Sequence, residues 1–300
     1  MNEGFVYRDQ LDVAASSAAA WYAARWGHGD AAAWVARMAA GEIDLNGRPL
    51  RIDGPLRPGD RLAWRRPPWE EPAVPLDFDR LYDDGDLLVI NKPSGLPVLP
   101  AGGFLTHTVL HQVALAEPQR PPRPVHRLGR GTSGLLVLAR SAGLRAHLSQ
   151  LLREHTAGAT TGCEKVYRAL AAAAPAEDQR VIDAPIGRVA HPTRGHLWNA
   201  DPAGAPAHGL LSVIERRPDG SALLDVTIQT GRPHQIRIHL ASIGCALVGD
   251  PLYGRIGSEA RPGEVGYLLH AARLRLTLPE GRPLDLTAPV PAALQTAAGD

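Results

Sequence analysis

Segments with strand character outnumber helical segments beyond residue 79, and the two kinds do not alternate regularly. Apolar residues three and four apart indicate helices at 107–117, 141–155 and 233–244. Apolar runs typical of strands occupy residues 87–92, 134–140, 165–173, 222–229, 273–278 and 283–288. A doubly wound parallel sheet needs regular alternation, so this order predicts an α+β fold with a mixed, mainly antiparallel sheet.

The first part of the chain predicts a separate small module. Two alanine-rich segments with tryptophans, at 15–27 and 30–41, read as helices, the second beginning after Asp30 and ending at Gly41. Alternating apolar residues and an Asn-Gly turn signal then indicate short strands. The proline-rich stretch that follows lacks periodicity. We predict a small α/β module at 12–68, a linker at 69–78 and a larger domain at 79–300.

Composition excludes several classes of protein. Cys163 and Cys245 are the two cysteines, and no Cys-x-x-Cys spacing suggests a disulfide framework or a zinc site. The first ten residues carry acids where a signal peptide would be basic, and no apolar run approaches the roughly 18 residues of a membrane span. We expect a cytoplasmic protein that has no membrane segment and binds no metal.

Positive charge is concentrated in one window of the chain, although the net charge is only +1. No acid lies between Glu117 and Glu154. If the arginines of that window share a face, they would contact several RNA phosphates; solvated surface arginines are the alternative. These residues are Arg120, Arg123, Arg127, Arg130, Arg140, Arg145 and Arg153.

A glycine motif lies inside this window, in HRLGRGTSGLLVLAR at 126–140. Gly129, Gly131 and Gly134 match the spacing of the dinucleotide-binding fingerprint. That fingerprint opens a helix, whereas the five apolar residues that follow Gly134 read as a strand. We therefore expect no nucleotide cofactor.

Two further segments carry candidate site residues. In TGRPHQIRIHLASIG, a helix beginning near Pro233 would place Gln235 and His239 on one side, with an ordinary amphipathic surface helix as the alternative. Asp250 follows within GDPLYG, where a turn acceptor is the simplest interpretation. In EKVYRAL, Tyr167 and Lys165 alternate along a strand and so share a face, with a core tyrosine as the alternative that the local pattern favours.

Taken together, these segments resemble the RluA-type family of RNA pseudouridine synthases. LYDDGDLLVINKPSGLPVLP, VHRLGRGTSGLLVLAR, EKVYRAL and TGRPHQIRIHLASIGCALVGDPLYG occur in the family's order over roughly residues 80–280. The front unit resembles the alpha-L RNA-binding module through WVARMAAGEIDLNG and LRPGDRL.

The resemblance implies isomerisation of uridine to pseudouridine in rRNA or tRNA, without a cofactor or metal. In that family an aspartate acts on the nucleotide, a tyrosine stacks on the flipped base, and an arginine pairs with the aspartate. By position these are Gly129, Tyr167 and Arg237. We expect the RNA contacts to come from Arg123, His126, Arg127, Arg130, Thr132, Ser133, Arg232, His234 and Gln235.

Glycine at 129 removes the family's reactive carboxylate, and its loss would leave Arg237 without its partner. Three interpretations follow. The chain is a synthase in which Asp250, Glu164 or a bound water fills the space; or it is an RNA-binding pseudoenzyme; or it has been adapted to a nucleoside or nucleotide.

Overall fold

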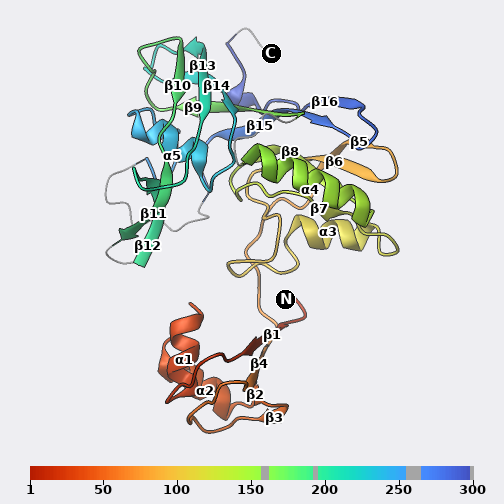
Figure 1. The fold of residues 1–300 in the computed structure, drawn as a ribbon, viewed down its shortest axis with the longest axis vertical. Coiled ribbons are helices and arrows are strands. Elements are labelled where there is room, and N and C mark those ends of the chain that lie inside the picture. Colours follow the sequence, from red (N-terminus) through yellow and green to blue (C-terminus); the bar gives the residue numbers. More distant parts are fainter. Residues whose placement is uncertain (157–161, 192–194, 255–264, 298–300) are drawn as a thin grey trace. The chain divides into compact units, whose positions relative to one another are not determined.

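The computed structural model describes residues 1–156, 162–191, 195–254 and 265–297. They form two compact units, Met1–Glu71 and Pro72–Asp300, each with its own hydrophobic core (Figure 1). Across these ranges, every helix is too short or too polar to cross a membrane.

The first unit is a four-stranded sheet with two helices, as the alternating pattern predicts. Its sheet begins ahead of residue 12, because β1 (Phe5–Gln10) pairs with β4 (Arg61–Arg66) along its whole length. Asn46 and Gly47 have φ angles of 52° and 81°, which makes the predicted tight turn between β2 and β3. In sheet order the strands are β1 (Phe5–Gln10), β4 (Arg61–Arg66), β2 (Ile43–Leu45) and β3 (Arg48–Pro49); the helices are α1 (Ala18–Arg25) and α2 (Ala31–Ala39).

Stacked aromatic rings hold the helices of this unit to its sheet. Tyr22 of α1 stacks on Trp34 of α2 at 4.4 Å between ring centroids, and Trp34 meets Trp64 of β4 edge-on at 4.8 Å. Both helices are capped by side chains: Ser17 accepts from the Ala20 N–H, and Asp30 accepts from the Ala33 N–H. The predicted start of the second helix at Asp30 is thereby confirmed, whereas the first helix begins three residues later than predicted, after Ser17.

The second unit is built on a ten-stranded mixed sheet in which β15 and β8 form a parallel pair. The other pairings within this sheet are antiparallel, which confirms the predicted α+β class. In path order the strands are β10 (Gln179–Ile182), β13 (Gly209–Arg216), β14 (Ala222–Ile228), β9 (Cys163–Ala171), β15 (Leu269–Thr277), β8 (Ser133–Ala139), β6 (Leu87–Lys92) and β5 (Asp79–Asp83); β16 (Pro283–Thr287) pairs with β15, and β7 (Arg123–Pro124) with β8.

The helices of this unit pack on the sheet, and one hairpin projects from it. α3 (Val109–Ala116) and α4 (Ala142–Thr156) lie on the side of β6 and β8 (Figure 1). The short helix α5 (Gln235–Ser242) is buried from Gln235 to Leu240, so the alternative of an amphipathic surface helix is wrong. The hairpin of β11 (Ile186–His191) and β12 (Gly195–Ala200) extends beyond α5, away from the large sheet (Figure 1). A short 3₁₀ helix, Ala292–Leu294, follows the last strand.

Gly134 is required by the sheet. It has a φ of +102°, and a Cβ at this position would lie 2.3 Å from the carbonyl oxygen of Ala271 on β15. Only glycine allows β8 and β15 to approach this closely. The last glycine of the fingerprint-like motif therefore serves strand packing.

Candidate active site

A buried ion pair joins the motif TGRPHQIRIHLASIG to the motif GDPLYG. Arg237 of α5 donates from Nε to Asp250 Oδ2 at 2.8 Å and from Nη2 to Oδ1 at 2.7 Å. The Arg237 side chain is 4% exposed and the Asp250 side chain is fully enclosed. The expectation that Gly129 leaves Arg237 without a partner is therefore wrong, because Asp250 forms a bidentate pair with it.

Asp250 also accepts from the backbone N–H groups of Leu252 and Tyr253, at 2.9 and 3.0 Å. This confirms its interpretation as a turn acceptor. Burial raises the pKa of Asp250, but the hydrogen bonds from Arg237 and Tyr253 outweigh burial and leave this pKa below its ordinary value. With both oxygens hydrogen-bonded to the guanidinium, Asp250 fixes the orientation of Arg237.

Two tyrosine rings enclose the guanidinium of Arg237. Its Cζ lies 4.2 Å from the ring centroid of Tyr267 and 4.9 Å from that of Tyr253. Contact with two aromatic faces stabilises a cation that water hardly reaches. Arg237 is therefore a fixed positive charge with its aromatic neighbours in defined positions.

The hydroxyl of Tyr267 lies where a side chain at residue 129 would begin. A Cβ built on Gly129 would lie 2.7 Å from Tyr267 Oη and 3.3 Å from Thr132 Oγ1. These two hydroxyl groups are 3.3 Å apart and hydrogen-bonded. Gly131 also packs closely on the same ring, since its Cβ would lie 2.8 Å from Tyr267 Cε1. The two glycines make room for Tyr267, whose phenol oxygen lies within 2.7 Å of where the Cβ of residue 129 would be.

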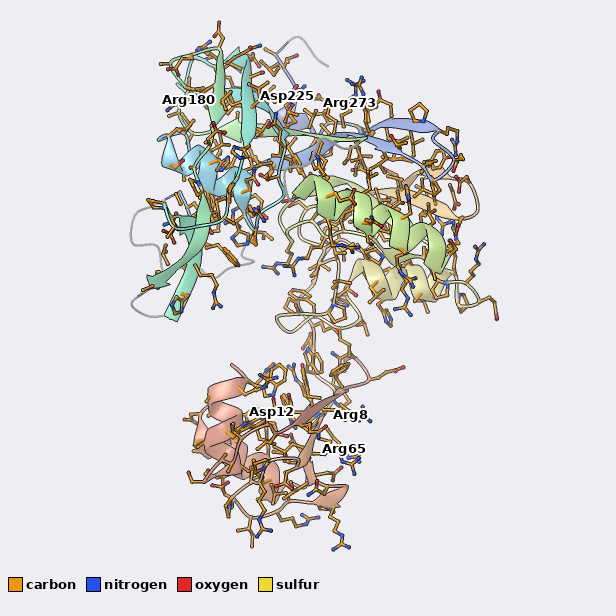
Figure 2. The ribbon with its side chains drawn as sticks, in the orientation of Figure 1. Arg8, Asp12, Arg65, Arg180, Asp225 and Arg273 are labelled. Atoms are coloured by element: carbon orange, nitrogen blue, oxygen red, sulfur yellow. The ribbon has the colours of Figure 1, made fainter. Side chains whose placement is uncertain are left out.

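Glu164, the other acid considered as a substitute, lies on a different face. Side chains alternate along a strand, so Glu164 of β9 points away from the face that carries Lys165 and Tyr167. It pairs with Arg275 at 3.5 Å, within a surface cluster that includes Asp285. Arg273, labelled in Figure 2, belongs to the same cluster on β15 and β16. Glu164 therefore belongs to a surface ion-pair cluster and points away from the face that carries Tyr167.

Lys92 ties the first motif to the glycine loop. Its side chain is completely buried, and Nζ donates to the carbonyl oxygens of Pro93, Leu96 and Arg130 at 2.8, 2.8 and 3.2 Å. Burial and the nearby charge of Arg130 lower its pKa to about 7. Because Arg130 follows Gly129 directly, Lys92 holds the loop whose backbone faces Tyr267.

Replacing Lys92 with methionine should lower the free energy of unfolding by about 1–3 kcal/mol, because buried carbonyl groups lose their donor. The folded-state pKa of about 7 lies below the unfolded value of about 10.4, so the unfolded chain binds more protons between these limits. Stability attributable to Lys92 should thus rise with pH across that window. Urea unfolding at several pH values should show this rise in the natural protein and lack it in Lys92→Met; identical pH profiles would contradict the assignment.

Tyr167 lies half-buried on β9, between the two apolar cores of the unit. Burial raises its pKa to about 12. The cavity beside its ring has a volume of about 10 Å³, near what one water needs, and includes His126 and Lys165 in its lining. A uracil base stacked on Tyr167 therefore requires neighbouring side chains to move aside.

Several residues expected to contact RNA are hydrogen-bonded inside the protein. Ser133 Oγ lies 2.8 Å from His270 Nδ1, and His126 Nε2 accepts from the Val137 N–H at 3.1 Å. Burial, with Lys165 contributing, lowers the pKa of His126 to about 3, so its ring is neutral. These side chains support the loop and the strand from within.

Gln235 holds the loop that precedes α5. Its Oε1 accepts from Thr230 Oγ1 and the Arg232 N–H, and its Nε2 donates to the carbonyl of His208. Arg232 Nε donates to the carbonyl of Pro206 at 2.9 Å. His234 precedes α5 with a left-handed φ of 56°, and its Nδ1 lies 2.9 Å from Tyr253 Oη.

The arginine window does not act as one face. Arg140 is buried between Asp83 and Glu117, and Arg120 pairs with Asp86. Arg123 and Arg127 are exposed, on β7 and on the glycine loop. Arg130 lies over the ring of Phe104 at 5.1 Å from its centroid, and Arg145 and Arg153 belong to α4. The alternative of ordinary surface arginines holds for part of the window.

Comparison with known proteins agrees with this architecture. The family described as RNA pseudouridylate synthase matches residues 86–242. An uncharacterized RNA pseudouridine synthase of Synechocystis is 42% identical over 92% of this chain and 94% of its own length. RNA pseudouridine synthase 5 of Arabidopsis thaliana is 36% identical over 99% of this chain and 95% of its own. Human RNA Pseudouridylate Synthase Domain Containing 4 is 25% identical, with a TM-score of 0.56 over 72% of this chain and 89% of that structure.

The chain therefore belongs to the RNA pseudouridine synthase family, and the resemblance drawn from its four ordered motifs is confirmed. Sequence reasoning missed Tyr267 and Tyr253 as neighbours of Arg237. Tyr253 lies inside GDPLYG and was available from that motif, whereas no motif marks Tyr267.

Proposed function

We propose that this protein isomerises uridine to pseudouridine within RNA, at a site centred on Arg237 and Tyr267. The observation that carries this proposal is the position of Tyr267 Oη, 2.7 Å from where the first side-chain atom of residue 129 would lie. This oxygen lies next to the residue that the resemblance assigns to the family's aspartate, and the guanidinium of Arg237 lies 4.2 Å from the same ring. rRNA or tRNA, met in the cytoplasm, is the proposed substrate.

The chemistry requires the bond between C1′ and N1 to break, the uracil to turn, and C5 to bond to C1′ with loss of its proton. A positioned oxygen acts in such a sequence as a nucleophile or as a general base. The guanidinium of Arg237, 4.2 Å from the ring centroid of Tyr267, places a fixed positive charge beside this oxygen. Asp250 contributes by holding that charge in place.

The first unit is proposed to bind RNA as an alpha-L-like module. Its predicted helices, turn and final strand are all present, and arginines lie on several of its elements. Arg8 of β1 and Arg65 of β4 are labelled in Figure 2. Phosphate contacts from such residues would guide RNA without reading its sequence.

Replacing Tyr167 with phenylalanine should nearly abolish turnover and hardly change RNA affinity, because the ring that stacks is kept and the hydroxyl is lost. Tritium release from C5-labelled uridine in cellular RNA measures turnover, and a gel shift measures affinity. Tyr82→Phe, on surface strand β5, serves as the matched control. Full turnover in Tyr167→Phe would show that the Tyr167 hydroxyl takes no part in the reaction.

A further inference from the structure

A groove of the second unit lies beside the Arg237 site and shares Tyr253 with it. It has a volume of about 380 Å³ and is lined by Arg188, His196, Leu197, Trp198, His234 and Tyr253. One wall belongs to the β11–β12 hairpin, and the other to the residues just before α5 and after Asp250. This volume lies in the range of small-ligand sites in proteins.

Charge in the groove favours an anion. None of its six lining residues is acidic. Arg188 is exposed and forms no ion pair within the described parts of the chain. Arg127 of the glycine loop is close enough to contribute, after burial and Arg237, to a lower pKa of His234. His234 is therefore neutral near pH 7, and the arginines supply the positive charge.

Trp198 provides an exposed aromatic face in this groove. It is 36% exposed and is the only tryptophan after residue 71. In the hairpin register it lies directly opposite Arg188, so their side chains share one face of the hairpin. An aromatic ring beside an arginine is the combination that binds single-stranded RNA, through base stacking and phosphate contact.

Hydrogen bonds connect Trp198 to the candidate active site. Tyr253 Oη donates to the carbonyl oxygen of Trp198 at 2.8 Å and lies 2.9 Å from His234 Nδ1. The ring of Tyr253 in turn lies 4.9 Å from the Arg237 guanidinium carbon. The groove is thus held at a fixed position one aromatic residue away from Arg237.

We propose that this groove binds the nucleotide next to the target uridine, with its base stacked on Trp198 and its phosphate on Arg188. The inference rests on the proposed function, since it places the neighbour of a uridine held at Arg237. The hairpin of β11 and β12 then binds the RNA chain next to the target uridine. A single free nucleotide at Arg237 would have no neighbouring base to place on this hairpin.

The test uses the full-length protein, fluorescein-labelled decauridine and fluorescence anisotropy. Trp198→Ala should weaken binding about thirtyfold, the middle of the range for one stacked base, whereas Trp198→Phe should stay within about threefold of the natural protein. Arg188→Gln should weaken binding and reduce its salt dependence. Leu210→Ala, which removes another exposed apolar side chain of the same unit, is the matched control and should have no effect.

Competition with uridine 5′-monophosphate identifies what occupies the groove. Trp198→Ala should leave the affinity for the mononucleotide unchanged while affinity for decauridine falls. Equal losses for both would overturn the inference, because the groove would then take the single nucleotide itself, and so would unchanged decauridine binding.

Tritium release from cellular RNA separates this inference from the proposed function. If the natural protein releases label and Trp198→Ala does not change decauridine affinity, the groove inference is wrong and the proposed function stands. A Trp198 effect on binding without any release would support the groove and contradict the isomerase.

Discussion

Asp250→Asn should lower the free energy of unfolding by about 3–5 kcal/mol and abolish tritium release, because it leaves the buried charge of Arg237 without a counter-charge. Urea unfolding measures the first effect and label release from C5-tritiated uridine the second. Asp285→Asn, in the exposed cluster with Arg273 and Arg275, is the control and should shift the unfolding midpoint much less. Similar shifts for the two variants would contradict the assigned burial.

The same pair sets a pH dependence with a defined sign. The folded-state pKa of Asp250 lies below its unfolded value, so the ionised form stabilises the fold. This contribution should be complete above the unfolded pKa of about 3.9 and be lost as pH falls through the folded value. Asp250→Asn should therefore lack that part of the acid dependence.

Tyr267→Phe should slow tritium release at least about 100-fold, the lower limit for loss of a group in proton transfer. The ring remains over Arg237, so unfolding and RNA binding should change little. Release at the natural rate would show that the phenol oxygen takes no part in the reaction.

Gly129→Asp tests whether Tyr267 fills the space beside residue 129. Alone it should be destabilising by about 1–3 kcal/mol, because its Cβ would lie 2.7 Å from Tyr267 Oη. Combined with Tyr267→Phe, the hydroxyl is gone and the nearest remaining atom is Thr132 Oγ1 at 3.3 Å, which needs to shift by only a few tenths of an ångström to admit the aspartate. The double variant should recover release that Tyr267→Phe lacks. A well-tolerated Gly129→Asp with Tyr267 unchanged would contradict the geometry.

Local signals in the sequence were sufficient for much of the fold. The cap at Asp30, the Asn46-Gly47 turn and the apolar runs of the central strands each depend on residues close together in the chain. The hairpin of β11 and β12 was missed because most of its side chains are half-buried or exposed, and its strands lack a continuous apolar run.

The site was predictable only in part, for a topological reason. Arg237 and Tyr167 follow from motif position, but Thr132 and Tyr267 are separated by 135 residues and meet because β8 and β15 pair in parallel. No local pattern distinguishes Tyr267 from a core tyrosine. The partner of Arg237 was missed for a simpler reason, since a turn aspartate thirteen residues away also satisfies a buried charge.

Tritium release from cellular RNA labelled at uridine C5, using the natural protein beside Tyr267→Phe, tests the central claim most directly. The proposed isomerase should release label, and Tyr267→Phe should lose at least about 99% of that rate. RNA that is bound by the natural protein but keeps all its label would contradict the isomerase and identify an RNA-binding pseudoenzyme.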